Sequence, residues 1–171
     1  AGGWDAIFVG SGAPRGLDLA IPGRAEIATN IHIATDWLAS VTFKHIERIG
    51  RRVLVIGGGN TAMDSARTAR RIGGEAVTLV NRGARTEMRA ALWEQDEATR
   101  EGVAIRELLS PKCFVHDGER LRGVEFDCVQ SIQENGKRRL VPTGKTEQIE
   151  CDDVILAIGQ EAAFPWIERD M

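Results

Sequence analysis

Three small residues at a fixed spacing are the first feature of this chain that could do chemistry. Gly57, Gly59 and Ala62 form the pattern G-x-G-x-x-A, directly after the apolar run Val53–Ile56. In this pattern the first glycine allows a sharp turn, the second lets a ligand approach the backbone, and the third small residue lets a helix pack near a strand. A helix that begins here directs free N–H groups at an anion. We therefore predict a binding site for a dinucleotide pyrophosphate. The other residues of the turn are Gly58, Asn60 and Thr61.

A second group of residues with chemical potential is basic. NAD-specific folds place an acidic residue about 20 positions beyond the glycines, where it binds the ribose 2′-hydroxyl. In this chain that position holds the neutral Asn81. It is followed by Arg82, Arg85 and Arg89. Because guanidinium groups pair with a phosphate that a carboxylate would repel, this stretch predicts NADP(H) rather than NAD(H).

A strand–turn–helix–strand unit is needed to position these residues, and the sequence contains one. The apolar run before the glycines is typical of a parallel strand that is covered on both faces. From residue 62 to 72, alanines recur at helical spacing, and Gly73-Gly74 then ends the helix. The second strand, 76–80, follows at once, which gives the expected length of about 30 residues.

The rest of the chain predicts an α/β fold: a Rossmann-like parallel sheet with helices and an added antiparallel β-meander. A helix at 92–101 and a strand at 103–105 continue the alternation. From Pro111 to residue 150 the pattern favours the meander, with a solvated basic loop at 137–139. An apolar strand at 153–156 ends in the small residues Ala157, Ile158 and Gly159. We expect that end to approach a cofactor.

The two ends of the chain lack the regular strand–helix pattern of the middle. Residues 6–9 predict a short strand, and the glycines at 10–13 imitate a nucleotide loop, but Pro14 and Arg15 break the pattern. Residues 15–34 have no sustained periodicity, and we expect Thr35 to cap a helix that begins near Asp36. We predict a single domain over 1–171, with 1–34 and 160–171 as connectors.

Composition narrows the function classes. The chain has 171 residues, a net charge of −3, 43% hydrophobic and 27% charged residues. These values favour neither nucleic acid nor an anionic membrane as partner, and no apolar run approaches the ~18 residues of a membrane helix. Without a visible signal peptide we expect a cytoplasmic protein. The cysteines form no C-x-x-C, so we predict reduced thiols and no metal site. Because it lacks an initial Met, the chain reads as a piece of a longer protein.

These segments together resemble one family, the small (beta) subunit of NADPH-dependent glutamate synthase, with the electron-input part of dihydropyrimidine dehydrogenase in the same group. The resemblance covers about residues 6–160. The matching stretches are 55–64, 77–82, 87–88, 101–103 and 154–160.

The resemblance implies an NADPH-binding domain inserted into an FAD domain, with hydride passing from NADPH to FAD and electrons passing on to a partner subunit or domain. It implies that 58–61 hold the pyrophosphate, that Arg82 and Arg89 hold the 2′-phosphate, and that 157–159 lie near the nicotinamide and flavin. The family's FAD-binding glycine loop is absent here, so we expect this chain alone to bind NADP(H), not FAD, and to be inactive without its FAD domain. Hydride transfer needs positioning rather than acid–base chemistry, so we predict no catalytic side chain.

The sequence is also compatible with two other functions. The chain could be a non-catalytic nucleotide-binding or sensing module, because the flavin loop is missing. A methyltransferase that binds S-adenosylmethionine also uses a glycine loop, but it usually has an acidic residue where Asn81-Arg82 stand.

Overall fold

The structure is a computed structural model, and it describes residues 3, 5, 6, 8, 10, 12–27, 29–134 and 136–163. Within these ranges the elements, in chain order, are β1 Arg15–Gly16, β2 Ile31–Ile33, α1 Ala34–Thr42, β3 Arg52–Ile56, α2 Asn60–Arg71, β4 Ala76–Val80, the 3-10 turn η1 Arg85–Glu87, α3 Leu92–Arg100, β5 Val103–Arg106, β6 Leu109–Asp117, β7 Arg120–Glu134, β8 Lys137–Glu150, β9 Asp153–Leu156 and β10 Gln160–Glu161.

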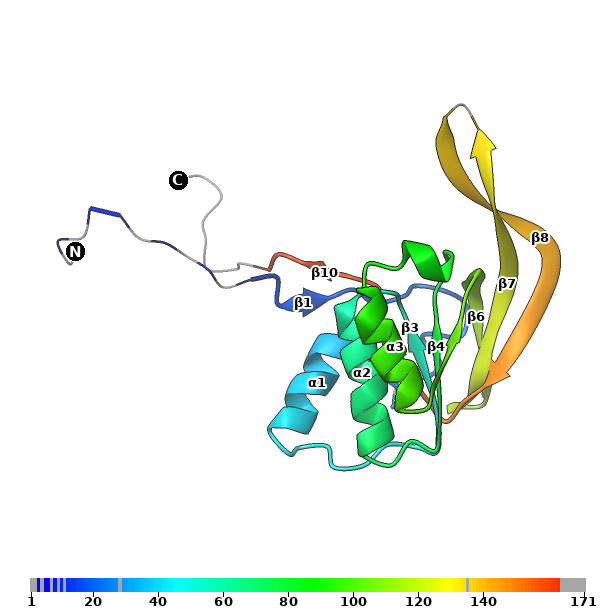
Figure 1. Cartoon of the computed structure of the whole chain (residues 1–171). Coiled ribbons are helices and arrows are strands. Elements are labelled where there is room, and N and C mark those ends of the chain that lie inside the picture. The colour runs from blue at the N-terminus through cyan, green and yellow to red at the C-terminus, as the bar shows by residue number, and fades with distance from the viewer. Residues whose placement is uncertain are drawn as a thin grey trace.

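A five-stranded parallel sheet, in the order β2-β9-β3-β4-β5, forms the middle layer (Figure 1). Its central strand β3 is buried on both faces, as its apolar run predicts. Val53 and Val55 face the helices, while Leu54 and Ile56 face the opposite side. The α/β fold with a parallel sheet and an antiparallel meander is confirmed.

Helix α2 packs on the sheet through its alanines. Ala62, Ala66 and Ala69 are all 0% exposed, which shows that the helical spacing places them on one inner face. The helix ends as the glycine pair predicts: Gly73 has a φ of 115°, and the Gly74 N–H donates to the Ala69 carbonyl at 2.9 Å. The short alanine side chains bring the start of α2 close to the end of β3.

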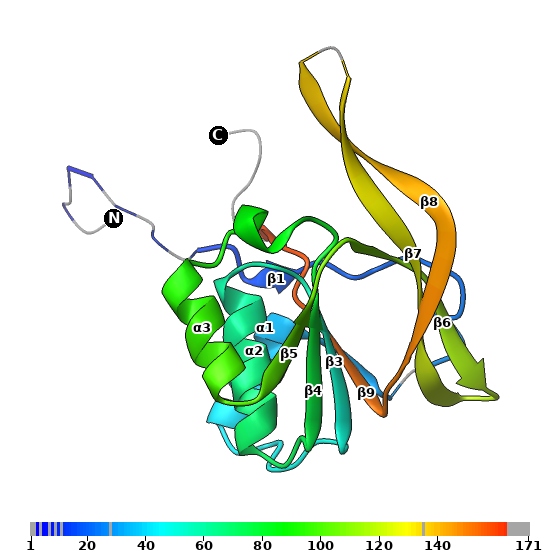
Figure 2. The same cartoon turned by 45° about the vertical axis from the view of Figure 1, so that its right-hand side comes forward.

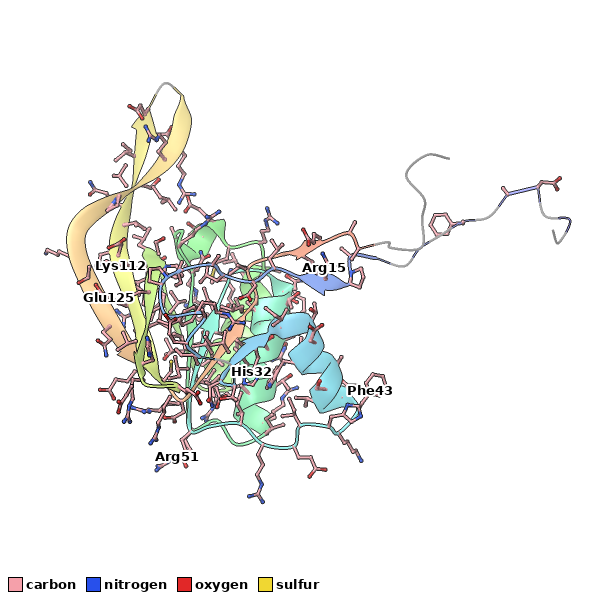
Figure 3. The ribbon with its side chains drawn as sticks, turned by 180° about the vertical axis from the view of Figure 1, so that it is seen from behind. Arg15, His32, Phe43, Arg51, Lys112 and Glu125 are labelled. Atoms are coloured by element: carbon pink, nitrogen blue, oxygen red, sulfur yellow. The ribbon has the colours of Figure 1, made fainter. Side chains whose placement is uncertain are left out.

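The other face of the sheet is covered by the meander β6-β7-β8 (Figure 2). Phe114, Val124 and Phe126 point toward the sheet, whereas Lys112 and Glu125 form a 2.6 Å ion pair on the same meander (Figure 3). The far half of the β7–β8 hairpin extends beyond the rest of the molecule (Figures 1 and 2). The prediction of a basic loop at 137–139 is wrong, because β8 already begins at residue 137 and pairs with β7.

Two predictions near the N-terminus need correction. Strand β2, within the range 1–34 expected as a connector, is an edge strand of the main sheet and pairs in parallel with β9. Three residues are too short to show a periodicity, and the pairing with a distant strand decides the conformation. Thr35 does not cap α1; Ile33 is the N-cap residue, without a side-chain bond. The predicted strand at 6–9 falls partly outside the described residues, and Ala6 and Phe8 within it are not in a strand.

The ends of the described chain run side by side. Strand β1 pairs antiparallel with β10 (Figure 1). Between these strands, Arg15 Nη1 lies 3.3 Å from Glu161 Oε1. The two segments that enter and leave the domain are therefore neighbours.

None of the helices in the described part of the chain is long and apolar enough to cross a membrane. Cys113, Cys128 and Cys151 are free thiols, and burial raises the pKa of Cys151 to about 12.

Candidate functional site

A groove of about 910 Å³ opens at the carboxyl ends of β3, β4 and β9. After β3 the chain builds β4 and β5 on one side, while β9 and β2 lie on the other, so the strand order reverses between β3 and β9. Open α/β sheets bind ligands at this kind of switch point. Most of the residues singled out in the sequence meet here.

Gly57 makes the sharp turn at the floor of the groove. Its N–H donates to the Val80 carbonyl at 2.9 Å, and its φ of 149° suits glycine. A Cβ at this position would lie 2.3 Å from the carbonyl oxygen of Ala157. The absence of a side chain is therefore what allows the turn after β3 to pass close to the end of β9.

The next two glycines differ from each other. A Cβ on Gly58 would come within 2.6 Å of Asn81 Oδ1, whereas a Cβ on Gly59 would have no neighbour within 4 Å. Gly59 is the N-cap of α2, and no side chain caps the helix. The N-terminus of α2 thus presents open space and backbone donors to the groove, which is the arrangement that a phosphate needs.

The predicted arginines separate into two groups. Arg82 and Arg89 line the groove, and within the described residues neither forms an ion pair. Arg85 does not line the groove. Its Nε donates to Gln95 Oε1 at 3.1 Å, and its Nη2 lies 3.2 Å from Asp96 Oδ1, so α3 holds this guanidinium.

Asn81, at the end of β4, lines the groove with a neutral side chain. Its Nδ2 donates to the Gly83 carbonyl at 3.0 Å, which fixes the amide against the backbone. Because this side chain carries no charge, the residue after β4 adds no negative charge to the groove.

The small residues after β9 form the other end of the groove. Ala157, Ile158 and Gly159 all line it, and the Gly159 carbonyl accepts a 3.0 Å hydrogen bond from the Leu17 N–H. Of the predicted turn, Thr61 lines the groove, while Ala62 is buried beneath it and the exposed Asn60 is outside the lining.

The sequence assigned no role to two groove residues: Glu87, which lies within the family-matching stretch 87–88, and Arg138. They form an ion pair with each other, between η1 and the β7–β8 hairpin. Arg138 belongs to the basic run that suggested a solvated loop, and only the pairing of β8 with β7 brings it to the groove. No local signal in the sequence could have found it.

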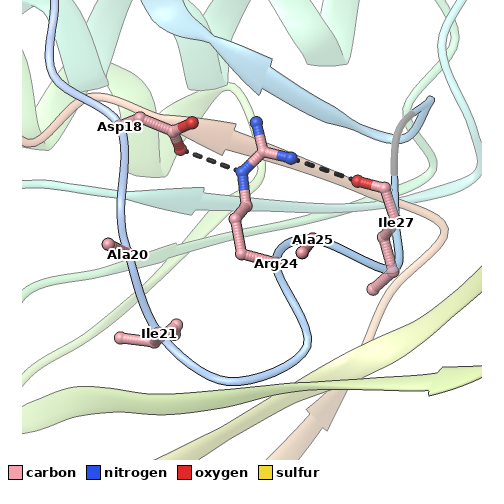
Figure 4. Close-up of a pocket in the computed structure, with 6 residues that line it drawn as sticks. All are labelled: Asp18, Ala20, Ile21, Arg24, Ala25 and Ile27. Atoms are coloured by element: carbon pink, nitrogen blue, oxygen red, sulfur yellow. Dashed lines mark hydrogen bonds and ion pairs between the residues drawn. The ribbon is translucent and has the colours of Figure 1, made fainter.

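A smaller hollow lies in the loop at 18–27 (Figure 4). Arg24 Nε donates to Asp18 Oδ1 at 2.9 Å, and its Nη1 donates to the Ile27 carbonyl at 3.1 Å. The Arg24 guanidinium holds the pKa of Asp18 below its usual range. Because its cation is already paired, this hollow is a weaker anion site than the groove.

None of the three histidines, His32, His45 and His116, lines the groove. His32 Nε2 is 2.8 Å from Asp153 Oδ1 at the amino end of β9 (Figure 3), and His116 Nδ1 is 2.7 Å from the Gly118 carbonyl. Neither has a place in the groove chemistry.

One known protein family matches nearly the whole of this chain. The model of one family, described as pyridine nucleotide-disulphide oxidoreductase, matches residues 3–170. The chain belongs to the pyridine nucleotide-disulphide oxidoreductase family.

Curated relatives confirm the resemblance to the glutamate synthase small subunit. The chain is 36% identical to the NADPH-Fe(3+) oxidoreductase subunit beta of Geobacter sulfurreducens over 98% of its length, which is 26% of that protein. It is 32% identical to the NADP(+)-dependent formate dehydrogenase subunit beta of Moorella thermoacetica, over 96% of the chain and 24% of the relative. The glutamate synthase [NADPH] small chain of Halomonas elongata is 32% identical over 96% of the chain and 37% of the relative. The chain thus spans about a quarter to somewhat over a third of these relatives.

Solved structures show the same fold. The FprA oxidoreductase of Mycobacterium tuberculosis superposes with a TM-score of 0.76 at 17% identity, over 96% of this chain and 52% of that one. A thioredoxin reductase of Lactococcus lactis superposes with a TM-score of 0.62 at 23% identity, over 84% of this chain and 41% of that one.

Proposed function

We propose that this chain is the NADPH-binding domain of a flavin-dependent oxidoreductase. The observation that carries the proposal is the groove at the switch point, where an uncapped helix N-terminus and the guanidinium groups of Arg82 and Arg89 line one cavity. An open helix terminus suits a pyrophosphate, and free arginines suit a phosphate monoester.

The residues present fit this nucleotide. The empty volume in front of Gly59, which a Cβ would fill, would accept the pyrophosphate, held by the turn at 57–61. Arg82 and Arg89 would hold the 2′-phosphate, since Asn81 offers no carboxylate to repel it. Ala157, Ile158 and Gly159 would hold the nicotinamide end. Three relatives with NADPH or NADP(+) in their names support this choice.

When bound, NADPH supplies a hydride. The role of this chain is to bind and orient the nucleotide, and no acid, base or nucleophile is needed from it. We propose that the hydride acceptor is an FAD held by another domain of the same protein, and that electrons pass from it to a partner subunit or domain. Two facts support this: the Geobacter and Moorella relatives are each about four times as long as this chain, and both are named as beta subunits.

The nucleotide part of the proposal is tested by equilibrium titration of the chain with NADPH and NADH. We expect NADPH to bind at least tenfold more tightly, because one charge-assisted contact to the 2′-phosphate accounts for about 1.5–3 kcal/mol. Equal affinities, or tighter binding of NADH, would contradict it.

The flavin part is tested on the whole protein. We expect it to purify yellow and to be bleached by NADPH under anaerobic conditions. A colourless full-length protein that still binds NADPH would favour the alternative, a nucleotide-binding or sensing module without catalysis.

A further inference from the structure

The ion pair between Arg138 and Glu87 joins two parts of the fold that lie far apart in the sequence. Glu87 ends η1, in the loop that follows β4, and Arg138 lies near the start of β8 in the protruding hairpin. Both side chains line the groove. The side chains are 33% and 34% exposed, so the pair is shielded from solvent over most of its surface.

Glu87 is held in place independently of Arg138. Its Oε2 also accepts a hydrogen bond of 2.9 Å from the Ala84 N–H at the start of η1. A Cβ on Gly83 would lie 3.4 Å from the same oxygen, so the carboxylate sits directly beside the backbone that follows Arg82. The fold therefore fixes a negative charge next to the proposed 2′-phosphate position.

Arg138 is oriented by the hairpin itself. Its Nε donates to Ser131 Oγ, on the partner strand β7, at 2.7 Å, and this leaves Nη2 directed at Glu87. The same Nη2 would lie 3.5 Å from a Cβ on Gly83. The guanidinium is thus positioned over the carboxylate before any ligand binds.

We propose that Arg138 determines the preference of the groove for a 2′-phosphate by neutralising Glu87, and this inference rests on the proposed function. Among the side chains that line the groove, Glu87 supplies a negative charge beside the positive charges of Arg82 and Arg89. An uncompensated carboxylate at this place would repel a dianionic phosphate, as the acidic residue of NAD-specific domains does. The hairpin acts on the groove through its arginine, which makes Arg138 a positioning residue rather than a direct ligand.

The test uses two ligands that differ by one group. Adenosine 2′,5′-bisphosphate carries the 2′-phosphate, and adenosine 5′-monophosphate lacks it. Calorimetric affinities for both are measured on the wild-type chain, Arg138→Ala, Glu87→Gln and the double variant. Arg139→Ala is the matched control, since Arg139 is the next residue of β8, is 64% exposed, pairs with Glu134 at 2.5 Å and does not line the groove. Thermal unfolding of each variant verifies that it is folded.

We expect Arg138→Ala to lower the affinity for the bisphosphate on the order of fivefold, which corresponds to about 1 kcal/mol for a partly shielded ion pair. The affinity for the monophosphate should fall by less than about twofold. The double variant should return to within twofold of wild type, because removal of the Glu87 charge makes the neutralising charge unnecessary. The loss in Arg138→Ala should shrink at 0.5 M salt, since ions screen the repulsion, and Arg139→Ala should match wild type.

Two results would overturn the role of Arg138 but leave the proposed NADP(H) site intact. Equal weakening of both ligands in Arg138→Ala would show that the arginine only supports the fold. A double variant as weak as Arg138→Ala would show that Arg138 does not act through Glu87. A wild-type chain that binds both ligands equally would instead refute the proposed NADP(H) site, and the inference with it.

Discussion

Asn81 lies against the glycine turn: its Oδ1 would be 2.6 Å from a Cβ added to Gly58. The residue at the end of β4 and the second residue of the turn therefore share one small space. A change in the size or charge of either residue should therefore alter the groove in which the nucleotide is proposed to bind.

The two glycines of the turn should respond differently to alanine. Gly58→Ala forces the new methyl group into Asn81, so we expect a loss of stability of about 1–3 kcal/mol together with weaker nucleotide binding. Gly59→Ala meets open space, so we expect a loss of under about 1 kcal/mol but a clear loss of binding, because the methyl group occupies the proposed pyrophosphate position. Thermal unfolding and NADPH titration separate the two effects. Unchanged NADPH affinity in Gly59→Ala would contradict the placement of the pyrophosphate.

Asn81→Asp should shift the cofactor preference toward NADH. The new carboxylate would repel a 2′-phosphate and accept a hydrogen bond from a 2′-hydroxyl, so we expect NADPH affinity to fall about tenfold while NADH affinity holds or rises. Asn81→Ala is the control, because it loses the bond to Gly83 without adding charge and should weaken both cofactors alike. Titration of both nucleotides measures the ratio. A ratio that Asp leaves unchanged would place the ribose elsewhere.

Arg82 and Arg85 should differ in their contribution to nucleotide binding. Arg82→Ala removes a cation that lines the groove, so we expect about a tenfold loss of NADPH affinity and less than a twofold loss for NADH. Arg85→Ala should leave both affinities near wild type, because Gln95 and Asp96 already hold that guanidinium. Calorimetry on the two variants decides between them. A selective loss of NADPH affinity in Arg85→Ala would instead indicate that Arg85, and not Arg82, contacts the 2′-phosphate.

Acid should weaken the packing of α2 against α3. The guanidinium groups of Arg71 and Arg67 hold the pKa of Glu101 below its usual value, which lies near 4.3 in unfolded chains. A lowered pKa in the folded state stabilises the fold above the unfolded value, and this contribution is lost as pH falls through the folded pKa. We expect Glu101→Gln to cost about 1 kcal/mol at pH 7 and much less at pH 3. Urea unfolding of the wild-type chain and of Glu101→Gln at the two pH values measures the difference in their free energies of unfolding. An equal difference at both pH values would show that it does not come from ionised Glu101.

The sequence predicts the parts of this fold that depend on local pattern. The buried run before the glycines, the alanine spacing of α2 and the glycine pair that ends it each correspond to an observed element. The carboxyl end of β9 also reaches the groove as expected, because small residues after an apolar strand indicate close approach.

The parts that were missed depend on contacts between distant segments. Strand β2 is three residues long and exists because it pairs with β9. Arg138 reaches the groove because β8 pairs with β7 in a long hairpin, and Arg85 turns away because Gln95 and Asp96 lie within reach of it. Side chains of the same type a few positions apart therefore have different roles, which spacing alone does not reveal.

The groove at the carboxyl ends of β3, β4 and β9 is the proposed position of the nucleotide. Backbone amide NMR of the isotope-labelled chain during titration with NADP⁺ tests it most directly. We expect the largest chemical-shift changes at the backbone amides of residues 58–61 and of Arg82. Saturable shifts confined to other regions, such as the loop at 18–27, with these amides unchanged, would contradict it.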